Sequence, residues 1–269
     1  MTPLPHYQVF ALRYASVARR RPENFMVHDP HDGPMPLDYF VWLVRGNGRS
    51  WLVDTGFNLA AAQARKRTFL RCPITHLERL DLKPQDISDV IITHLHYDHA
   101  GNVDLLPNAR IHLQEREMQY ATGRHMNHHL LRDAYAVDDV VEVVRGLYKD
   151  RVRFYNGDAE IAPGLQLVLV GGHTDGLQAV RVHTERGWVM LASDASHFYE
   201  NLHHESPYPI VFHVGDMLDG YHKVMALADS PDHMIPGHDP QVLARFPALG
   251  DPADDIVCLH QAPLKPLEI

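Results

Sequence analysis

Four side chains that can bind a metal ion lie within six consecutive residues, in the string His94-Leu95-His96-Tyr97-Asp98-His99. A strand would place positions 94, 96 and 98 on one face and position 99 on the other, and a helix would separate positions 94 and 96 by about 200°. Neither element can direct all four side chains to one point, so we expect a loop that leaves a buried strand over residues 90–93. Imidazole and carboxylate are ligands that zinc, iron, manganese and cobalt accept. The string therefore predicts a metal-binding loop.

The alternative origin of this string is chance, because the chain contains 21 histidines in 269 residues. A string of this form would arise at random roughly once in a hundred such chains, so composition explains it poorly. The string matches the signature His-x-His-x-Asp-His in full, and in this the sequence resembles the metallo-β-lactamase superfamily.

The resemblance implies three further metal ligands, each after an expected strand. They are His173 in Gly171-Gly172-His173-Thr174, Asp194 after residues 190–193, and His238 in Pro236-Gly237-His238-Asp239. It also implies how the ligands are shared between two ions: His94, His96 and His173 bind one, Asp98, His99 and His238 bind the other, and Asp194 bridges both. The resemblance further implies that Asp54 accepts a hydrogen bond from the outer nitrogen of a metal-bound histidine. The alternative is that Asp54 is an ordinary turn residue.

Strands and helices that could position these residues follow from the hydrophobic pattern. Strands are expected over residues 7–14, 38–45, 50–53, 90–93, 110–113, 152–155, 165–170, 178–184 and 188–192, with a hairpin turn at Gly46-Asn47-Gly48. Helices are expected over residues 59–70, 99–106, 114–122, 137–148 and 217–228. The resemblance implies an α/β fold, a four-layer αβ/βα sandwich of two mixed sheets with outer helices. We expect one domain over residues 1–269 with a cap at residues 114–151.

Composition limits the partners of the chain. A net charge of −9 and a pI near 6.1 argue against a nucleic-acid surface. The two cysteines, Cys72 and Cys258, are typical of a reducing compartment, and no apolar segment approaches the length of a membrane span. We therefore expect a cytoplasmic enzyme without a membrane or nucleic-acid partner. The long loop at residues 21–36 could reach over the site or serve a dimer contact, the alternative being a plain surface loop; by analogy with relatives in the superfamily, we expect a homodimer.

The ligand set that the resemblance implies would hold two divalent ions, with zinc as the first choice and manganese, iron or cobalt also suited. Two ions that share a water can bring its pKa from about 15.7 toward neutrality, so that a bridging hydroxide becomes the nucleophile. Asp98 is placed to move the proton. A redox centre of the flavodiiron type would need a glutamate in place of His96, and a cysteine-ligated β-lactamase site would need a cysteine near position 194.

For the substrate, the sequence most resembles the N-acyl homoserine lactonase group, which implies opening of a lactone ring and quorum quenching. A pyridoxolactonase and a thioester hydrolase of the glyoxalase II type remain as alternatives, together with a metal-binding protein without turnover.

The lactonase group usually has a tyrosine three residues after the bridging aspartate, where this chain has His197. We expect His197 to donate the hydrogen bond to the substrate, with Tyr199 as the other candidate. Aromatic residues between positions 198 and 214 could line the substrate pocket or belong to the core, and His125 and His129 could line its entrance or lie in solvent.

Overall fold

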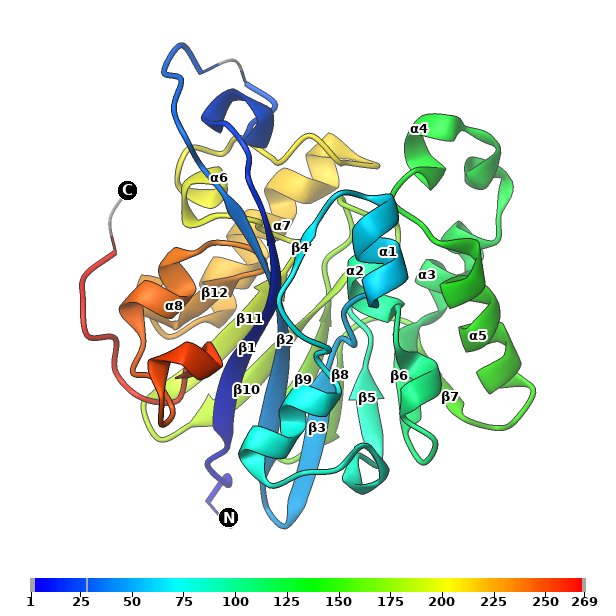
Figure 1. Cartoon of the computed structure of the whole chain (residues 1–269), viewed down its shortest axis with the longest axis vertical. Helices are drawn as coiled ribbons and strands as arrows, with labels where there is room; N and C mark the ends of the chain where they lie inside the picture. The colour runs from blue at the N-terminus through cyan, green and yellow to red at the C-terminus, as the bar shows by residue number, and fades with distance from the viewer. Residues whose placement is uncertain (1–2, 28, 268–269) are drawn as a thin grey trace.

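The computed structural model describes residues 3–27 and 29–267, which form two β-sheets with helices on their outer faces (Figure 1). The first sheet has the strand order β13-β1-β2-β3-β5-β6-β7, with β4 paired to β1, and the second has the order β12-β11-β10-β9-β8. Both sheets contain parallel and antiparallel pairs, so both are mixed.

The strands of the first sheet are β1 (Gln8–Val17), β2 (Leu37–Gly46), β3 (Arg49–Val53), β4 (Thr68–Phe69), β5 (Asp89–Ile91), β6 (Arg110–Gln114), β7 (Val152–Tyr155) and β13 (Ile256–Cys258). Those of the second are β8 (Ala159–Ala162), β9 (Leu165–Leu169), β10 (Gln178–Thr184), β11 (Gly187–Ser193) and β12 (Met234–Pro236). The α-helices are α1 (Leu59–Ala64), α2 (Tyr97–Ala100), α3 (Glu115–Ala121), α4 (His129–Arg132), α5 (Val137–Leu147), α6 (Tyr199–His203), α7 (Val214–Leu227) and α8 (Gln241–Arg245).

Strand β2 is apolar at nearly every position because both of its faces are buried. Alternate side chains point to opposite faces of a strand. Tyr39, Val41 and Leu43 accordingly belong to one buried cluster, which includes residues of α1, α2, α3 and α5. The residues between them, such as Trp42 and Val44, belong to a second cluster shared with the second sheet, α7 and α8. The order helices, sheet, sheet, helices confirms the predicted four-layer αβ/βα sandwich.

The hairpin between β2 and β3 turns where the sequence predicts it. Asn47 and Gly48 both have positive φ angles, 52° and 71°. A two-residue turn with two positive φ angles matches the twist of the flanking strands, and asparagine followed by glycine adopts it most easily. This turn sets the register in which Trp42 pairs with Val53.

The predicted helix over residues 59–70 is wrong in its second half. Helix α1 ends at Ala64, and Lys66 has a φ of 56°, a left-handed conformation that a helix cannot continue through. Thr68 and Phe69 then pair with β1 as strand β4. Arg65 and Arg67, which fall within the expected helix, lie between the two elements instead.

Other elements differ less from the prediction. The helix expected at residues 99–106 is instead α2 and a separate 3-10 turn, Val103–Leu105. Strands β8 and β13 were not predicted, because β8 has no buried residue and β13 is only three residues long. The expected cap at residues 114–151 contains α3, α4 and α5 (Figure 1).

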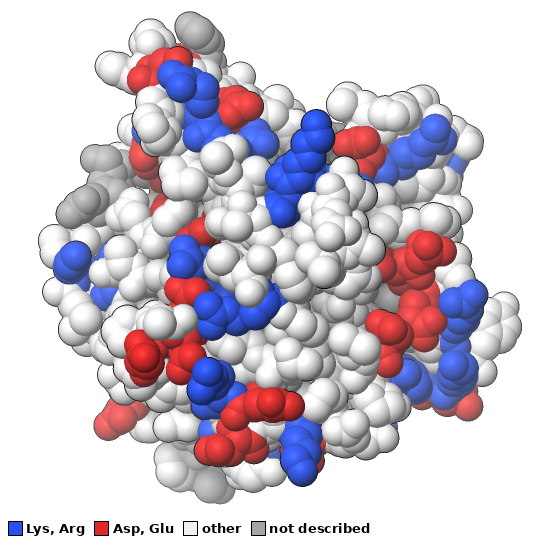
Figure 2. Space-filling model, in the orientation of Figure 1, with Lys and Arg blue, Asp and Glu red and all other residues white. Residues whose placement is uncertain are grey.

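Charged side chains of both signs are interspersed on the face drawn in Figure 2, without a large area of one sign. Within the described residues, no helix has the length and apolar character that crossing a membrane requires.

The packing of the second sheet leads to a stability prediction. Leu191 is fully buried in β11, between Val180 of β10 and Ile235 of β12, whereas Leu130 in α4 is 86% exposed. We expect Leu191→Ala to lower the free energy of unfolding by about 2–5 kcal/mol, because it leaves a cavity. The same change at Leu130 should alter it by no more than about 0.5 kcal/mol. Urea unfolding followed by circular dichroism measures both values, and equal effects would contradict the assignment of Leu191 to the core.

Candidate metal centre

Ends of four strands converge at one edge of the sandwich and bring the predicted ligands together. The string at residues 94–99 follows β5, His173 follows β9, Asp194 follows β11, and His238 follows β12. These residues are at most 9% exposed. The structure thus brings together all seven residues that the sequence analysis expects as metal ligands, in groups that could hold an ion: one of His94, His96, His173 and Asp194, and another of Asp98, His99 and His238.

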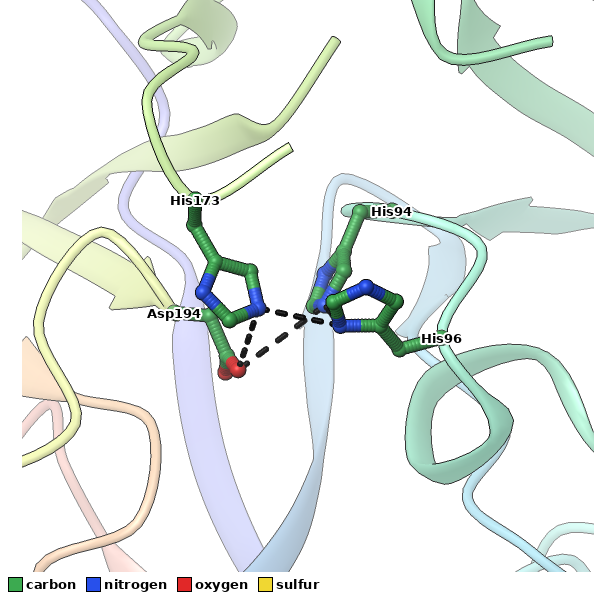
Figure 3. A group of neighbouring side chains, drawn as sticks. All are labelled: His94, His96, His173 and Asp194. Atoms are coloured by element: carbon green, nitrogen blue, oxygen red, sulfur yellow. Dashed lines mark hydrogen bonds and ion pairs between the residues drawn. The ribbon is translucent and has the colours of Figure 1, made fainter. Parts of the chain in front are cut away.

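Three imidazoles of the first group point their ring nitrogens at one another (Figure 3). Nδ1 of His96 lies 3.0 Å from Nε2 of His94 and 3.0 Å from Nε2 of His173. Oδ2 of Asp194 completes the group, 3.1 Å from Nε2 of His173 and 3.8 Å from Nε2 of His94. Donor atoms around a tetrahedral zinc ion with bonds of about 2.0–2.1 Å lie about 3.3 Å apart, so these separations fit one ion.

The second group meets the other oxygen of the same aspartate. Oδ1 of Asp194 lies 2.9 Å from Nε2 of His238 and 3.3 Å from Nε2 of His99. Oδ2 of Asp98 is 3.7 Å from Nε2 of His99 and 4.0 Å from Nε2 of His238. Asp194 therefore presents one oxygen to each group, which is the arrangement a bridging carboxylate requires.

Hydrogen bonds behind the histidines fix the tautomers that this arrangement needs. Nδ1 of His173 lies 2.7 Å from the carbonyl oxygen of Ile210, and Nδ1 of His238 lies 2.8 Å from that of Asp38. A carbonyl oxygen only accepts, so each Nδ1 carries a proton, and in its neutral form each ring turns a bare Nε2 toward Asp194. Lone pairs facing a carboxylate oxygen repel it unless a cation lies between them. The residues therefore fit divalent metal ions.

Asp54 supports two other ligands in the way that the sequence analysis expects. Its Oδ2 lies 2.7 Å from Nδ1 of His99, and it also accepts a hydrogen bond from the hydroxyl of Thr93 at 2.9 Å. That hydroxyl lies 3.1 Å from Nδ1 of His94. Nε2 of His99 is buried and makes no hydrogen bond, which leaves it free for an ion.

Electrostatics keep two histidines of the first group, His94 and His96, neutral. Burial, followed by the neighbouring imidazoles, holds the pKa of His94 and of His96 well below the usual value. Burial alone would raise the pKa of Asp194, but the charge interaction with the surrounding histidines outweighs it and holds that pKa well below its usual range. Asp194 in turn raises the pKa of His99 and of His238 against the effect of their burial. Neutral imidazoles around an ionised carboxylate are the protonation states that metal binding requires.

His197 lies against this centre, as predicted, and Tyr199 does not. Nε2 of His197 is 3.1 Å from Oδ2 of Asp194, and its ring stacks on that of Tyr208 with centroids 3.9 Å apart. Burial lowers the pKa of His197 to about 3, so the ring is neutral at pH 7. Tyr199 is buried instead beneath the guanidinium of Arg245, which lies 5.0 Å from its ring centroid. Of the aromatic residues considered at positions 198–214, Tyr208 lines the metal pocket.

The pocket above the centre has a volume of about 80 Å³. Its rim includes Arg65 and Arg67, which the sequence analysis missed because it placed them on a helix surface. Arg65 donates to the carbonyl oxygens of Asp133 and Tyr135, at 2.6 and 3.3 Å. Arg67 donates to the hydroxyl of Tyr97 at 3.1 Å and to the carbonyl oxygen of Arg65 at 2.8 Å. Among the described residues, neither guanidinium is within 4 Å of a carboxylate.

Glu117 is a second residue that the sequence analysis missed. It is fully buried and accepts four hydrogen bonds: from the backbone of Leu95 and the hydroxyl of Tyr135 at one oxygen, and from the hydroxyl of Thr174 and the backbone of Gly176 at the other. Leu95 lies between the first two histidines of the string, and Thr174 follows His173. One carboxylate thus ties together the two loops that carry the first group. The sequence signal that could have revealed Glu117 is an acidic residue on the same helical face as the apolar Met118 and Ala121.

The role of Glu117 can be tested through stability. Glu117→Gln keeps the shape but turns an NH2 group toward two of the four donors, and each buried donor left without an acceptor costs about 1–3 kcal/mol. We expect the free energy of unfolding to fall by at least that amount. Glu115→Gln, an exposed position in the same helix, should cost less than about 1 kcal/mol. Urea denaturation compares the two variants, and similar losses would rule out Glu117 as the tie between the loops.

Comparison with known proteins places these features in a family. Over 136 residues the chain is 34% identical to N-acyl homoserine lactonase from Bacillus cereus, a match that covers 50% of this chain and 49% of that protein. It is 35% identical over 133 residues to N-acyl homoserine lactonase AiiB from Rhizobium rhizogenes, with 46% of each chain covered. The chain spans about half the length of the curated relatives it matches.

Solved structures share the fold over a longer stretch. A quorum-quenching N-acyl homoserine lactone lactonase superposes with a TM-score of 0.74 at 23% identity, over 90% of this chain and 95% of that one. An N-acyl homoserine lactone hydrolase with the product N-hexanoyl-L-homoserine at its catalytic metal centre gives a TM-score of 0.72 at 22% identity, over 87% and 94%. The sequence profile of the metallo-beta-lactamase superfamily matches residues 35–257, and this chain therefore belongs to that superfamily.

Proposed function

We propose that this protein is a metal-dependent hydrolase that opens lactone rings, with N-acyl homoserine lactones as the first substrates to test. The observation that carries the proposal is the position of Asp194, whose two oxygens face two separate groups of ligands. The names of the sequence relatives support the reaction, and the product in one structural neighbour supports the substrate class. Members of one family can catalyse different reactions, so family membership alone does not identify the reaction of this chain.

The seven ligands would hold two divalent ions, and we propose zinc because three or four imidazole and carboxylate donors suit it. Divalent ions in such a site lower the pKa of water and polarise the carbonyl group of an ester. The chain itself contributes orientation and proton transfer. Asp98 lines the pocket and is the proposed acceptor of the proton that is released.

His197 is the proposed positioning group for the substrate. As a neutral imidazole it has one N–H to donate: its Nε2 lies 3.1 Å from Oδ2 of Asp194, its Nδ1 makes no hydrogen bond, and Tyr208 holds its ring from one side. A donor fixed in this way stabilises the oxygen of the lactone carbonyl as charge develops on it. The homodimer, the cytoplasmic location and the absence of a nucleic-acid partner remain predictions.

A second candidate follows from Arg65 and Arg67. Two guanidinium groups without a carboxylate partner at the rim of the pocket favour a substrate with an anionic group. A thioester whose thiol part carries carboxylates, as in glyoxalase II, meets that condition, whereas an acyl homoserine lactone is uncharged. The two candidates use the same metal ligands and differ in the bond that is broken.

Metal removal tests the reaction class. We expect dialysis against a chelator to abolish hydrolysis of a panel of lactones, and two equivalents of zinc or manganese per chain to restore it, since the ligands account for two ions. Elemental analysis should give about half the metal content for His173→Ala, which removes one ligand of the first group only. Asp216→Asn, an exposed carboxylate in α7, serves as the matched control and should change nothing. Turnover of thioesters without turnover of any lactone would reject the first candidate in favour of the second.

The role of His197 can be tested with a variant that removes its N–H donor but keeps an aromatic ring stacked on Tyr208. His197→Phe keeps an aromatic ring against Tyr208 but removes the N–H, so we expect kcat/KM for lactones to fall about 100-fold. Tyr199→Phe should have no effect, because that hydroxyl lies outside the pocket. Steady-state kinetics on metal-loaded protein of both variants gives the comparison. A larger loss for Tyr199→Phe would assign the role to Tyr199 instead.

A further inference from the structure

An arginine and two tyrosines form a hydrogen-bonded row along the wall of the metal pocket. Nε of Arg67 donates to the hydroxyl oxygen of Tyr97 at 3.1 Å, and that oxygen lies 3.2 Å from the hydroxyl oxygen of Tyr39. All three residues line the pocket, and Tyr39 and Tyr97 are 3% and 5% exposed. This donor row is therefore shielded from bulk water but open to a molecule bound at the centre.

The direction of the bonds in the donor row follows from its first member. A guanidinium only donates, so the oxygen of Tyr97 accepts from Arg67. An oxygen that accepts from a cation becomes a better donor and a poorer acceptor, because hydrogen bonds in a chain polarise one another. Tyr97 therefore donates its own O–H to Tyr39, and the O–H of Tyr39 is the last in the row. Among the described residues, no acceptor other than Tyr97 lies within hydrogen-bond distance of the hydroxyl of Tyr39.

The donor row ends beside the second group of ligands. Tyr97 directly precedes Asp98 in the metal-binding string. The ring of Tyr39 meets that of His238 edge-on, with centroids 5.3 Å apart. Asp98, the proposed acceptor of the released proton, lines the same pocket. Because buried donors are rarely left unpaired, the free O–H at this place calls for an acceptor on the substrate.

We propose that the hydroxyl of Tyr39 donates a hydrogen bond to the oxygen that leaves when an ester bond of the substrate breaks. The inference rests on the proposed function. As the carbon–oxygen bond breaks, the alkoxy oxygen keeps the bonding electron pair, and the proton that Asp98 has taken from the attacking water completes the alcohol. A fixed donor stabilises the charge on that oxygen before the proton arrives. Tyr39 is then a catalytic residue, and Arg67 is a positioning residue that acts through Tyr97.

A donor at this place favours one of the two candidate reactions. An alkoxide is a strongly basic leaving group and accepts hydrogen bonds well, whereas a thiolate is less basic and its sulfur accepts only weakly. The donor row therefore assists the breaking of an alkyl ester or a lactone more than that of a thioester. The inference adds to the proposed function a preference for substrates with an alkoxide leaving group.

Binding of two products that differ in one hydroxyl group tests the donor without turnover. N-Hexanoyl homoserine carries the hydroxyl that was the leaving oxygen, and N-hexanoyl 2-aminobutyrate lacks it. Calorimetry on zinc-loaded protein should give a dissociation constant about three- to tenfold lower for the first. Tyr39→Phe keeps the ring that packs on Phe57, with centroids 5.0 Å apart, and should abolish this preference. Tyr221→Phe is the matched control, because that buried hydroxyl has no hydrogen-bond partner among the described residues and does not line the pocket.

Kinetics with two kinds of leaving group test the role in catalysis. Tyr39→Phe should lower kcat/KM for alkyl lactones about 10- to 100-fold. It should lower kcat/KM for a p-nitrophenyl ester less than about threefold, because nitrophenolate is a stable anion that needs no donor. Arg67→Met removes the first donor of the row and should give the same pattern, and Arg67→Lys should recover part of the loss. Each variant should bind as much zinc as the unsubstituted protein.

Four results would overturn the assignment of Tyr39: no preference for the hydroxyl product in the unsubstituted protein, a preference that persists in Tyr39→Phe, an equal kinetic loss on alkyl lactones and the aryl ester, or loss of zinc from Tyr39→Phe. Full activity of Arg67→Met on alkyl lactones would overturn the role of Arg67. A preference that disappears in Tyr39→Phe, in a protein that hydrolyses no lactone or ester, supports the donor and overturns the proposed reaction.

Discussion

The buried carboxylate of Asp194 is the constraint on which the rest of the structure depends. It is 3% exposed, and nitrogens of His94, His99, His173, His197 and His238 lie within 4 Å of it. A buried ionised carboxylate is costly unless positive charge compensates it, and imidazoles in the neutral form that metal binding requires supply none. With its ligands in that form, the centre is incomplete as a set of protein groups alone. Divalent ions would supply the missing charge, and folding of these loops and metal binding should be coupled.

To hold five histidines around one carboxylate, the loops that carry them must pass very close to neighbouring backbone. Glycine, which has no Cβ, makes this close approach possible. A Cβ on Gly237 would lie 2.8 Å from the carbonyl carbon of Ser193, the residue before Asp194. A Cβ on Gly172, which has a φ of +83°, would lie 2.5 Å from the backbone of Met217 in α7. The glycines that precede His173 and His238 thus serve the packing of the strand ends. They explain why the two short strings around these histidines can be recognised in the sequence.

Sequence alone predicted the parts of this site that depend on local pattern. The string at residues 94–99, the strands before the ligands and the turn at Asn47 are each encoded by neighbouring residues, and the structure confirms their arrangement. Glu117, Arg65 and Arg67 were missed, because their roles depend on segments far away in the chain. Glu117 joins two loops, and the arginines line the pocket because α1 ends at Ala64 and the chain turns at Lys66. The single domain, the roles of the site residues and the homodimer stay predictions, since they concern boundaries, ions and a second copy that one folded chain does not contain.

The metal ligands and the helices of the expected cap are supplied by different parts of the chain. The ligands lie on strand ends and close loops, whereas a second, open cavity of about 480 Å³ is lined by residues of α3, α4 and α5, of the turns between them, and by Arg65. Tyr135 connects the two parts. It lines that cavity, its hydroxyl donates to Glu117 at 3.0 Å, and its ring lies 4.6 Å from that of His96. A change at Tyr135 should therefore alter both parts, because it removes a contact from His96 and a donor from the carboxylate that orders the first group.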